Sequence, residues 1–366
     1  MSVWAVVPHY GPPGPTLDLL EVLAAATVVP DGIVVVDNQG GLELDEDERV
    51  AVLRPGFNTG YGMAVERAAD AALSGGADWL WVLNNDARPA ADCLERLLEA
   101  GAADPRAGIL SPLIRYRAGG ELWYAGGGVS PRTLDVRHLH VAQGAAPYAT
   151  GFVTGCAPLL RAALVRELAP LDDGLFMYYE DVDWSLRALD GGWRLLVVPG
   201  AALVHDVHRE RGRRVFSDAA IYYMARNRVL VARRRGGVAP GAAAGDVAPG
   251  AAAEAAAPSS ARGFTTPAAA GRLALPAAAG RLALPAVAGA LWGLRQAAKS
   301  RTPAEAGRRL ATCCRGLRDG FTGRRGPRGS AGHPGPHDHL DGQDDPRNDL
   351  SAHHDPPSPR RGGAAS

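Results

Sequence analysis

The sequence has few features of a secreted, membrane-spanning or metal-cluster protein. Its four cysteines form no C-x-x-C pair and no spacing typical of a metal site, which favours a reducing compartment. No run of about 18 apolar residues occurs, so we expect no transmembrane helix. The chain begins with a strand-like run at 3–7, VWAVV, and no signal peptide is expected. We therefore expect a cytoplasmic protein that is soluble or peripheral at the inner face of the plasma membrane.

Net charge is also lacking. The 366 residues include 39 basic and 39 acidic side chains, and Lys299 is the only lysine. A chain with zero net charge gives no reason to expect binding to nucleic acid. The length exceeds that of a typical single domain, which predicts one large domain with additional segments.

The first forty residues predict a βαβ unit. A buried strand at 3–7 is followed by a helix at 17–27, with Thr16 as its N-cap, and by a second strand in IVVVDNQG at 33–40. Such a unit requires a parallel sheet. Because ligands of open α/β sheets bind beyond the carboxyl ends of the strands, the stretches Pro8-His9-Tyr10 and Asp37-Asn38 lie where a ligand would bind. A helix cap or turn residue is the alternative for Asp37.

Two further segments carry small or polar residues directly after a strand or before a helix. In RPGFNTGYGMAVERAAD, Asn58 and Gly60 precede a predicted helix whose backbone amides would approach a phosphate or ribose. In WLWVLNNDA, a third buried strand runs into Asn84 and Asp86, which are candidate binding residues. The alternative to a binding role is a turn that follows the strand.

The stretch 172–205, DDGLFMYYEDVDWSLRALDGGWRLLVVPGAALVH, has the highest density of candidate residues. An aromatic run leads to Glu180, Asp181 and Asp183 at the start of a predicted helix. Two β-rich runs follow and end at His205. Carboxylates at a helix start, with a histidine at the end of a strand, suit acid/base and metal chemistry.

These segments together resemble the family 2 glycosyltransferases, in the branch of rhamnosyltransferases and galactofuranosyltransferases. That family reads F-D-E-x-F-F-x-Y-x-E-D-x-D-L-x-x-R, then G-W, then V-P-x-A-x-V-x-H, which this chain matches in order and spacing over 172–205. The resemblance covers roughly residues 3–235. It implies a GT-A fold, which is a single α/β domain with a mixed, mostly parallel sheet.

The resemblance also implies roles for individual residues. Asp181 would be the general base of an inverting transfer, supported by Glu180, and Asp86 and His205 would hold Mg²⁺ or Mn²⁺. The donor-binding residues implied by the resemblance are Pro8, Tyr10, Asp37, Asn58, Gly60 and Asn84. The acceptor-binding residues it implies are Asp183, Trp184 and Tyr179, and residues Tyr222, Tyr223, Arg226 and Asn227 would also face the acceptor. Arginines 209, 211, 213 and 214 would meet the donor phosphates or form a solvated basic loop.

The implied donor is a nucleoside-diphosphate sugar, with dTDP-rhamnose first and a UDP-hexose or UDP-galactofuranose second. The implied acceptor is a lipid-linked or polymeric glycan of the cell envelope. Two alternatives stay open. A sugar-1-phosphate nucleotidyltransferase has a related fold, although PHYGPPGPT lacks the basic residue of its first loop. A non-catalytic relative that binds a nucleotide sugar is favoured by Asn84 in place of an acidic residue.

The domain prediction has four parts. Residues 1–235 form the glycosyltransferase domain, and residues 236–285 form an Ala/Gly/Pro-rich linker with a nine-residue unit, PAAAGRLAL, repeated in tandem. Residues 286–325 have helical periodicity and would dock on the catalytic domain, with contact to an anionic membrane surface as the alternative. Residues 326–366 have little to bury, which predicts a disordered tail.

Overall fold

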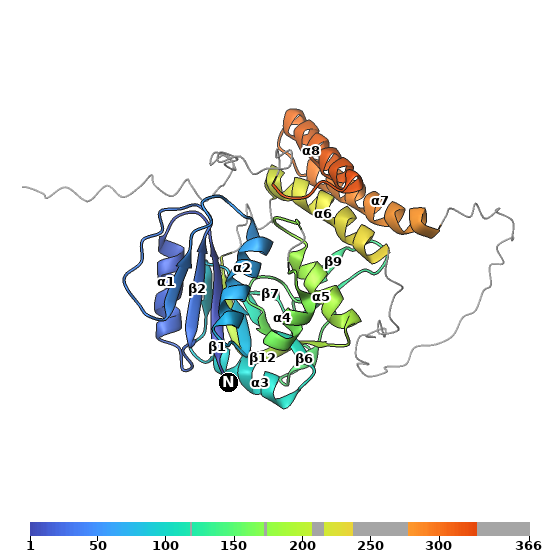
Figure 1. Ribbon diagram of the computed structural model, residues 1–366. Helices are drawn as coiled ribbons and strands as arrows, with labels where there is room; N and C mark the ends of the chain where they lie inside the picture. The colour runs from blue at the N-terminus through green and yellow to red at the C-terminus, as the bar shows by residue number, and fades with distance from the viewer. Residues whose placement is uncertain (118, 172–173, 207–215, 237–276, 328–366) are drawn as a thin grey trace, which may run out of the picture.

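In the computed structural model the protein is an α/β domain with a C-terminal helical extension (Figure 1). The structure describes residues 1–117, 119–171, 174–206, 216–236 and 277–327. The predicted tail from 328 and most of the predicted linker lie outside these residues, as do the four arginines at 209–214. Among the helices of the described ranges, none combines the length and the hydropathy needed to cross a bilayer.

Strands and helices are interspersed up to residue 103, and several consecutive strands follow between residues 107 and 161. The helices are α1 (Gly14–Ala24), α2 (Tyr61–Ser74), α3 (Cys93–Ala103), α4 (Ala162–Leu168), α5 (Glu180–Asp190), α6 (Asp218–Gly236), α7 (Ala277–Ala297) and α8 (Pro303–Thr322). The strands are β1 (Val3–His9), β2 (Gly32–Asp37), β3 (Val50–Leu53), β4 (Trp79–Val82), β5 (Ala87–Pro89), β6 (Ala107–Tyr116), β7 (Leu122–Tyr124), β8 (Gly127–Val129), β9 (Val136–His138), β10 (Tyr148–Ala149), β11 (Leu159–Arg161) and β12 (Arg194–His205).

One mixed sheet organises the domain, in the order β10-β12-β6-β11-β4-β1-β2-β3. Strands β4, β1, β2 and β3 are mutually parallel, and β12 is parallel to β6. The short β11 lies between these two parallel groups and is antiparallel to both β4 and β6. The βαβ unit predicted from the first forty residues is confirmed, since β1 pairs in parallel with β2.

Helices cover both faces of the sheet because alternate residues of each buried strand point to opposite sides. Ala5 and Val7 of β1 belong to a core with residues of α1 and α3. Val6 belongs to a second core, with residues of α2, α4 and α5. The carboxyl ends of the parallel strands thus open between two packed layers, and this edge carries the candidate site.

Three local expectations differ from the structure. Thr16 is not an N-cap, because α1 begins at Gly14 and the Thr16 hydroxyl is buried against His9. The two β-rich runs after α5 form one strand, β12, with an irregularity between Val198 and Ala202 that accommodates Pro199 and Gly200. Strand β3 was not predicted, because an edge strand of four half-exposed residues lacks a continuous apolar run.

The C-terminal helices α7 and α8 pack against α6 and against each other, on the side of the molecule away from β1 and β2 (Figure 1). Helix α7 begins at Ala277, inside the segment predicted to be a linker. The Thr302 side chain caps α8 by accepting from the Glu305 amide, and Gly323 ends it in the left-handed conformation. The four-part domain division remains a prediction.

Candidate active site

The carboxyl ends of β1, β2 and β4 bring several polar side chains to one edge of the sheet. His9 and Asp37 are opposite each other in the parallel register. The Thr16 hydroxyl lies 2.7 Å from His9 Nδ1 and accepts from Asn85 Nδ2 at 3.2 Å, so it links the ends of β1 and β4. Burial lowers the pKa of His9 below its ordinary value, with partial compensation from the Asp37 carboxylate, and this favours a neutral imidazole.

A second cluster forms where β5 pairs with β12. Residue Ala87 pairs with His205, which places Asp86 Oδ1 3.1 Å from His205 Nε2. The Asn84 amide nitrogen lies 3.3 Å from the same imidazole nitrogen, and Asn84 Oδ1 is buried without a hydrogen-bond partner. Burial by itself would lower the pKa of His205, but the adjacent Cys156 and Asp86 outweigh this effect and raise it well above its ordinary value.

This cluster has the chemistry of a partial divalent-cation site. A carboxylate, an amide oxygen and an imidazole are ligands that Mg²⁺ and Mn²⁺ accept. Across the described residues no group of three or more His, Cys, Asp or Glu side chains converges on one point. A cation bound by Asp86 and His205 would therefore need substrate oxygens and water to complete its coordination, which is how Mg²⁺ is commonly bound beside phosphates.

The acidic residues of α5 are positioned by an unusual loop. Phe176, Tyr178 and Tyr179 all have positive φ angles, of 68°, 67° and 73°. Each left-handed residue other than glycine costs on the order of 1 kcal/mol, so the surrounding contacts must hold the loop in this shape. Tyr179 is the N-cap of α5, and the loop therefore sets where Glu180 and Asp181 lie.

Two neighbouring residues of α6 hold this loop. Asn227 Nδ2 lies 2.6–2.9 Å from the backbone carbonyl oxygens of Leu175, Met177 and Tyr178. The guanidinium of Arg226 donates to the carbonyls of Gly174, Leu175 and Gly326. The Arg226 guanidinium also stacks over the ring of Tyr223, 4.8 Å from its centroid. Both side chains are fully buried.

The start of α2 holds the loop from the other side. The Phe176 carbonyl accepts hydrogen bonds from the Tyr61 and Gly62 amides, at 2.6 Å and 3.4 Å. Gly60 has a φ of 81°, and a Cβ there would lie 2.3 Å from the Phe176 oxygen. The expectation that these amides face a phosphate is therefore corrected, because a protein carbonyl takes that position. Gly60 permits the close approach of the loop.

Tyr61 lies near both the Asp86–His205 cluster and the acidic residues at the start of α5. Burial raises the pKa of Tyr61 well above its ordinary value, and the nearby negative groups of Glu180, Cys156, Asp181 and Asp86 raise it further. The Tyr61 hydroxyl donates to the Gly155 carbonyl, and the Gly155 amide donates to Asp181 Oδ2 at 3.1 Å. The structure thus brings the predicted base and the predicted cation ligands into one neighbourhood. Gly155 and Cys156 belong to the segment 151–168, which the family resemblance predicts to line the floor of the site through Thr154, Gly155 and Cys156, whereas Tyr61 had no predicted role.

The three predicted acceptor residues are buried. Trp184 is 2% exposed and donates its Nε1 hydrogen to the Leu171 carbonyl, so its ring is part of the core beneath the sheet. Asp183 is 3% exposed and forms ion pairs with Arg187 at 2.9 Å and Arg234 at 3.3 Å. Tyr179 is 4% exposed and donates to the Leu134 carbonyl.

These placements correct the acceptor assignment, because an aromatic ring inside the core cannot stack on a sugar. Asp183 ties α5 to α6, and Trp184 ties α5 to the loop before it. The same correction applies to Tyr222, Tyr223, Arg226 and Asn227, which are buried and hold internal contacts.

The predicted donor residues divide into two groups. Asp37 and Asn58 serve their own loops: the Asp37 carboxylate accepts from the Gln39, Gly40 and Leu42 amides, and Asn58 Oδ1 accepts from the Gly60 amide. The alternative role of Asp37 as a turn residue is therefore realised. Pro8 lies within β1, and Tyr10 follows the strand with a half-buried side chain. Contact of these residues with a donor stays a prediction.

The C-terminal extension reaches the loop that carries the acids. Tyr222 of α6 donates to Asp319 of α8 at 2.7 Å. The Gly326 amide donates to the Gly174 carbonyl at 2.8 Å, and the Gly326 carbonyl accepts from Arg226. The predicted docking of 286–325 on the catalytic domain is thus observed for its described helices.

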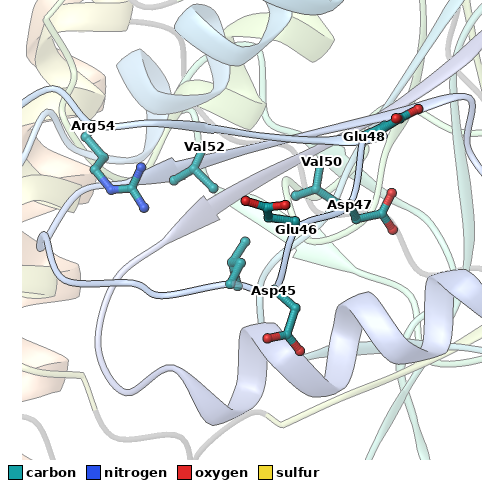
Figure 2. Close-up of a pocket in the computed structure, with 8 residues that line it drawn as sticks. Asp45, Glu46, Asp47, Glu48, Val50, Val52 and Arg54 are labelled. Carbon is teal, nitrogen blue, oxygen red and sulfur yellow. The ribbon is translucent and has the colours of Figure 1, made fainter.

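A cavity of about 400 Å³ lies elsewhere, beside the edge strand β3. Residues Asp45, Glu46, Asp47 and Glu48 line it, with Arg54 opposite, and their carboxylates point in different directions (Figure 2). None of the residues discussed above lines this cavity, so it is separate from the candidate site.

Comparison with known proteins identifies the class. Residues 79–229 match the family model described as glycosyl transferase family group 2. An N-acetylglucosaminyl-diphospho-decaprenol L-rhamnosyltransferase of Mycobacterium tuberculosis is 30% identical over 260 residues, which are 61% of this chain and 82% of that protein. The dTDP-rhamnosyl transferase RfbF of Shigella flexneri is 22% identical over 246 residues, which are 64% and 80% of the two chains.

A solved structure of GalNAc-T7 with UDP, GalNAc and Mn²⁺ has a TM-score of 0.48 and 16% identity, and the match covers 64% of this chain and 50% of that one. The chain thus spans half the length of that structure. The chain belongs to the family 2 glycosyltransferases, as the sequence resemblance predicted. It is a glycosyltransferase, and the mixed, mostly parallel sheet that was predicted for it is confirmed.

Proposed function

We propose that this enzyme transfers a sugar, with inversion, from a nucleoside-diphosphate sugar to a lipid-linked or polymeric glycan of the cell envelope. Rhamnose from dTDP-rhamnose is the first choice of donor, because the relatives from M. tuberculosis and S. flexneri are both named as rhamnosyltransferases. A UDP-sugar is the second choice. The name of the first relative includes a diphospho-decaprenol, which supports a lipid-linked acceptor at the inner face of the plasma membrane.

One observation supports the chemistry most strongly: the neighbouring residues Gly155 and Cys156 link Asp181 to the Asn84–Asp86 segment, because the Gly155 amide donates to Asp181 Oδ2 at 3.1 Å and the Cys156 carbonyl accepts from the Asn84 amide at 2.9 Å. A transfer site needs a base for the acceptor hydroxyl near the group that binds the donor diphosphate, and in the proposal the two carboxylates of Asp181 and Asp86 take these roles. The alternative of a non-catalytic relative does not require the two carboxylates to be near each other.

Asp181 is the proposed general base. Its side chain is partly buried and oriented by the Gly155 amide on Oδ2 and the Val182 amide on Oδ1. These two amides fix the orientation of the carboxylate. Because a carboxylate is a weak base near neutral pH, proton transfer from the acceptor hydroxyl to Asp181 is concerted with attack on the sugar carbon and late in the reaction. Glu180, the buried neighbour of Asp181, supports this carboxylate.

Asp86 and His205, with Asn84 Oδ1, are the proposed ligands of Mg²⁺ or Mn²⁺. Such a cation neutralises the negative charge on the nucleoside diphosphate as it leaves. The buried Asn84 oxygen without a hydrogen-bond partner fits this role, since an unpaired buried acceptor is costly without a ligand. In the proposal Asn84 and Asp86 orient the donor, and Pro8, Tyr10, Asp37 and Asn58 form the edge that receives its nucleoside.

Calorimetric titration of the purified protein with dTDP, UDP and GDP, with and without Mn²⁺, tests the donor site. We expect binding of dTDP that depends on Mn²⁺ and is lost in Asp86→Ala. Asp18→Ala is the matched control, because Asp18 is an exposed aspartate paired with Arg88. Nucleotide binding without transfer or donor hydrolysis would favour the non-catalytic relative. Failure of the folded protein to bind any nucleotide would refute the donor assignment.

A further inference from the structure

The outer face of α7 carries an apolar stripe. Leu284, Val287, Leu291 and Leu294 are 49%, 54%, 53% and 51% exposed, and we refer to these four residues as the α7 stripe. Their spacing of three, four and three residues places them on one side of the helix. The docked side of α7 is different in character, with Gly289 and Gly293 in close contact with Leu317 and Cys313 of α8.

Most of the exposed large hydrophobic residues in the described part of the chain lie on the C-terminal helices. Six of the ten exposed large hydrophobic residues in that part belong to α7 and α8, and four of them form the stripe. The others are dispersed among elements of the catalytic domain. Single exposed apolar residues are ordinary, whereas a contiguous row on one helix face indicates an interaction surface.

The charge around the stripe is strongly positive. Residues 277–327 contain ten arginine or lysine residues and two acidic residues, in a chain whose net charge is zero. The two acids are engaged internally, since Glu305 pairs with Arg309 at 2.7 Å and Asp319 bonds to Tyr222. No aspartate or glutamate occurs between 277 and 304. The extension therefore presents cations without exposed carboxylates nearby.

The cations flank the stripe itself. Arg295 follows Leu291 by four residues, Lys299 follows Arg295 by four, and both side chains are exposed. Residues four apart on a helix are neighbours, so Arg295 continues the stripe at the end of α7, and Lys299 lies in the turn that directly follows the helix. Apolar side chains beside a row of cations are the surface that matches an anionic bilayer, in which acyl chains lie beneath phosphate groups.

We propose that the α7 stripe inserts into the interfacial region of an anionic phospholipid bilayer, with Arg295 and Lys299 on lipid phosphates. The described helix cannot span the bilayer, so it lies in the plane of the surface. The contact also orients the enzyme, because α8 bonds to α6 through Asp319 and Tyr222, and Gly326 bonds to Gly174 at the start of the loop that leads to Glu180 and Asp181. A lipid-linked acceptor would then reach Asp181 from the membrane, and only this last consequence rests on the proposed function.

Co-sedimentation of the full chain with vesicles tests the proposal. We expect binding to vesicles of phosphatidylglycerol and phosphatidylcholine, little binding to phosphatidylcholine alone, and weakening by salt. Leu291→Glu should reduce the binding about tenfold or more, because the carboxylate enters an apolar and anionic layer. The double variant Arg295→Gln, Lys299→Gln should also reduce it about tenfold or more. Val141→Glu is the matched control, since Val141 is 70% exposed and lies outside the extension.

Three outcomes would overturn the proposal. In the first, the folded protein does not bind the anionic vesicles. In the second, Leu291→Glu binds them as well as the unaltered chain does. In the third, the protein does not bind vesicles and light scattering shows a dimer that Leu291→Glu dissociates, which would assign the α7 stripe to contact between two copies. The assay contains no sugar donor, so a failure of the rhamnosyltransferase assignment leaves its result unaffected.

Discussion

The most informative perturbation of the active-site loop is Asn227→Leu. The Asn227 amide is fully buried and lies within hydrogen-bonding distance of three carbonyls of the 175–178 segment. Leucine has a similar volume but donates no hydrogen bond, so the Met177 and Tyr178 carbonyls lose this donor inside the protein, while the Leu175 carbonyl keeps the bond from Arg226. An unsatisfied buried carbonyl costs about 1–3 kcal/mol, and we expect the free energy of unfolding to fall by about 2–4 kcal/mol.

The same change should reduce catalysis beyond its effect on stability. Without Asn227 the left-handed residues Phe176, Tyr178 and Tyr179 lose a main support, and the start of α5 shifts. Misplacement of a catalytic group by about 1 Å can reduce a rate about a hundredfold. We therefore expect kcat to fall about tenfold to a hundredfold under conditions where the variant is folded, while its affinity for dTDP stays close to that of the unaltered enzyme.

Val231→Ala provides the control for stability. Val231 is on the same helix and is fully buried in the apolar core, and its side chain has no hydrogen bond to offer the loop. We expect it to lower the free energy of unfolding by about 2 kcal/mol with little change in kcat. Unfolding in urea and steady-state kinetics measure the two effects. If Asn227→Leu lowers kcat no more than Val231→Ala does, the positioning role of Asn227 is refuted.

Three further predictions concern stability. Gly60→Ala should destabilise the protein by about 2 kcal/mol more than Gly56→Ala does. Both glycines have a φ of 81°, but only a Cβ at position 60 collides with Phe176. Equal losses of stability to urea in the two variants would contradict this prediction. Burial by itself would raise the pKa of Asp37, but the Leu42, Gly40 and Gln39 amides outweigh this effect and lower it. The stabilisation that the ionised Asp37 carboxylate provides is present at neutral pH and is lost as the pH falls below about 4. The free energy of unfolding of Asp37→Asn should therefore depend less on pH in this acid range, and an unchanged pH dependence would count against the lowered pKa. Trp184→Phe should cost about 1 kcal/mol through the lost hydrogen bond and leave the KM for acceptor unchanged, whereas a large rise in that KM would restore the acceptor role.

Much of the fold was predictable because the parallel strands are buried on both faces. Continuous apolar runs such as those of β1 and β2 have no other ready interpretation, and their order defined the βαβ unit. The placement of Asp86 and His205 together was predictable only through the family resemblance, since 119 positions separate them and a short antiparallel pairing between β5 and β12 joins them.

The acceptor residues were wrongly predicted for a physical reason. The sequence shows that Trp184 lies at the start of a helix beside two acids, but it does not show which side of the helix faces the core. An aspartate is rarely buried without a partner, which favoured an acceptor-binding role for Asp183, whereas Arg187 and Arg234 allow it to be buried. Likewise, the left-handed loop at 176–179 contains no glycine at those positions, so nothing in its composition indicated that Asn227 and Arg226 would be needed to hold it.

The most direct test of the central claim is the transfer rate of Asp181→Asn, with dTDP affinity measured on the same sample. We expect the rate to fall about a hundredfold to ten-thousandfold, as for loss of a general base, while Mn²⁺-dependent binding of dTDP is retained. A transfer rate close to that of the unaltered enzyme would contradict the assignment of Asp181 as the base and would require a different residue near Tyr61 to remove the proton.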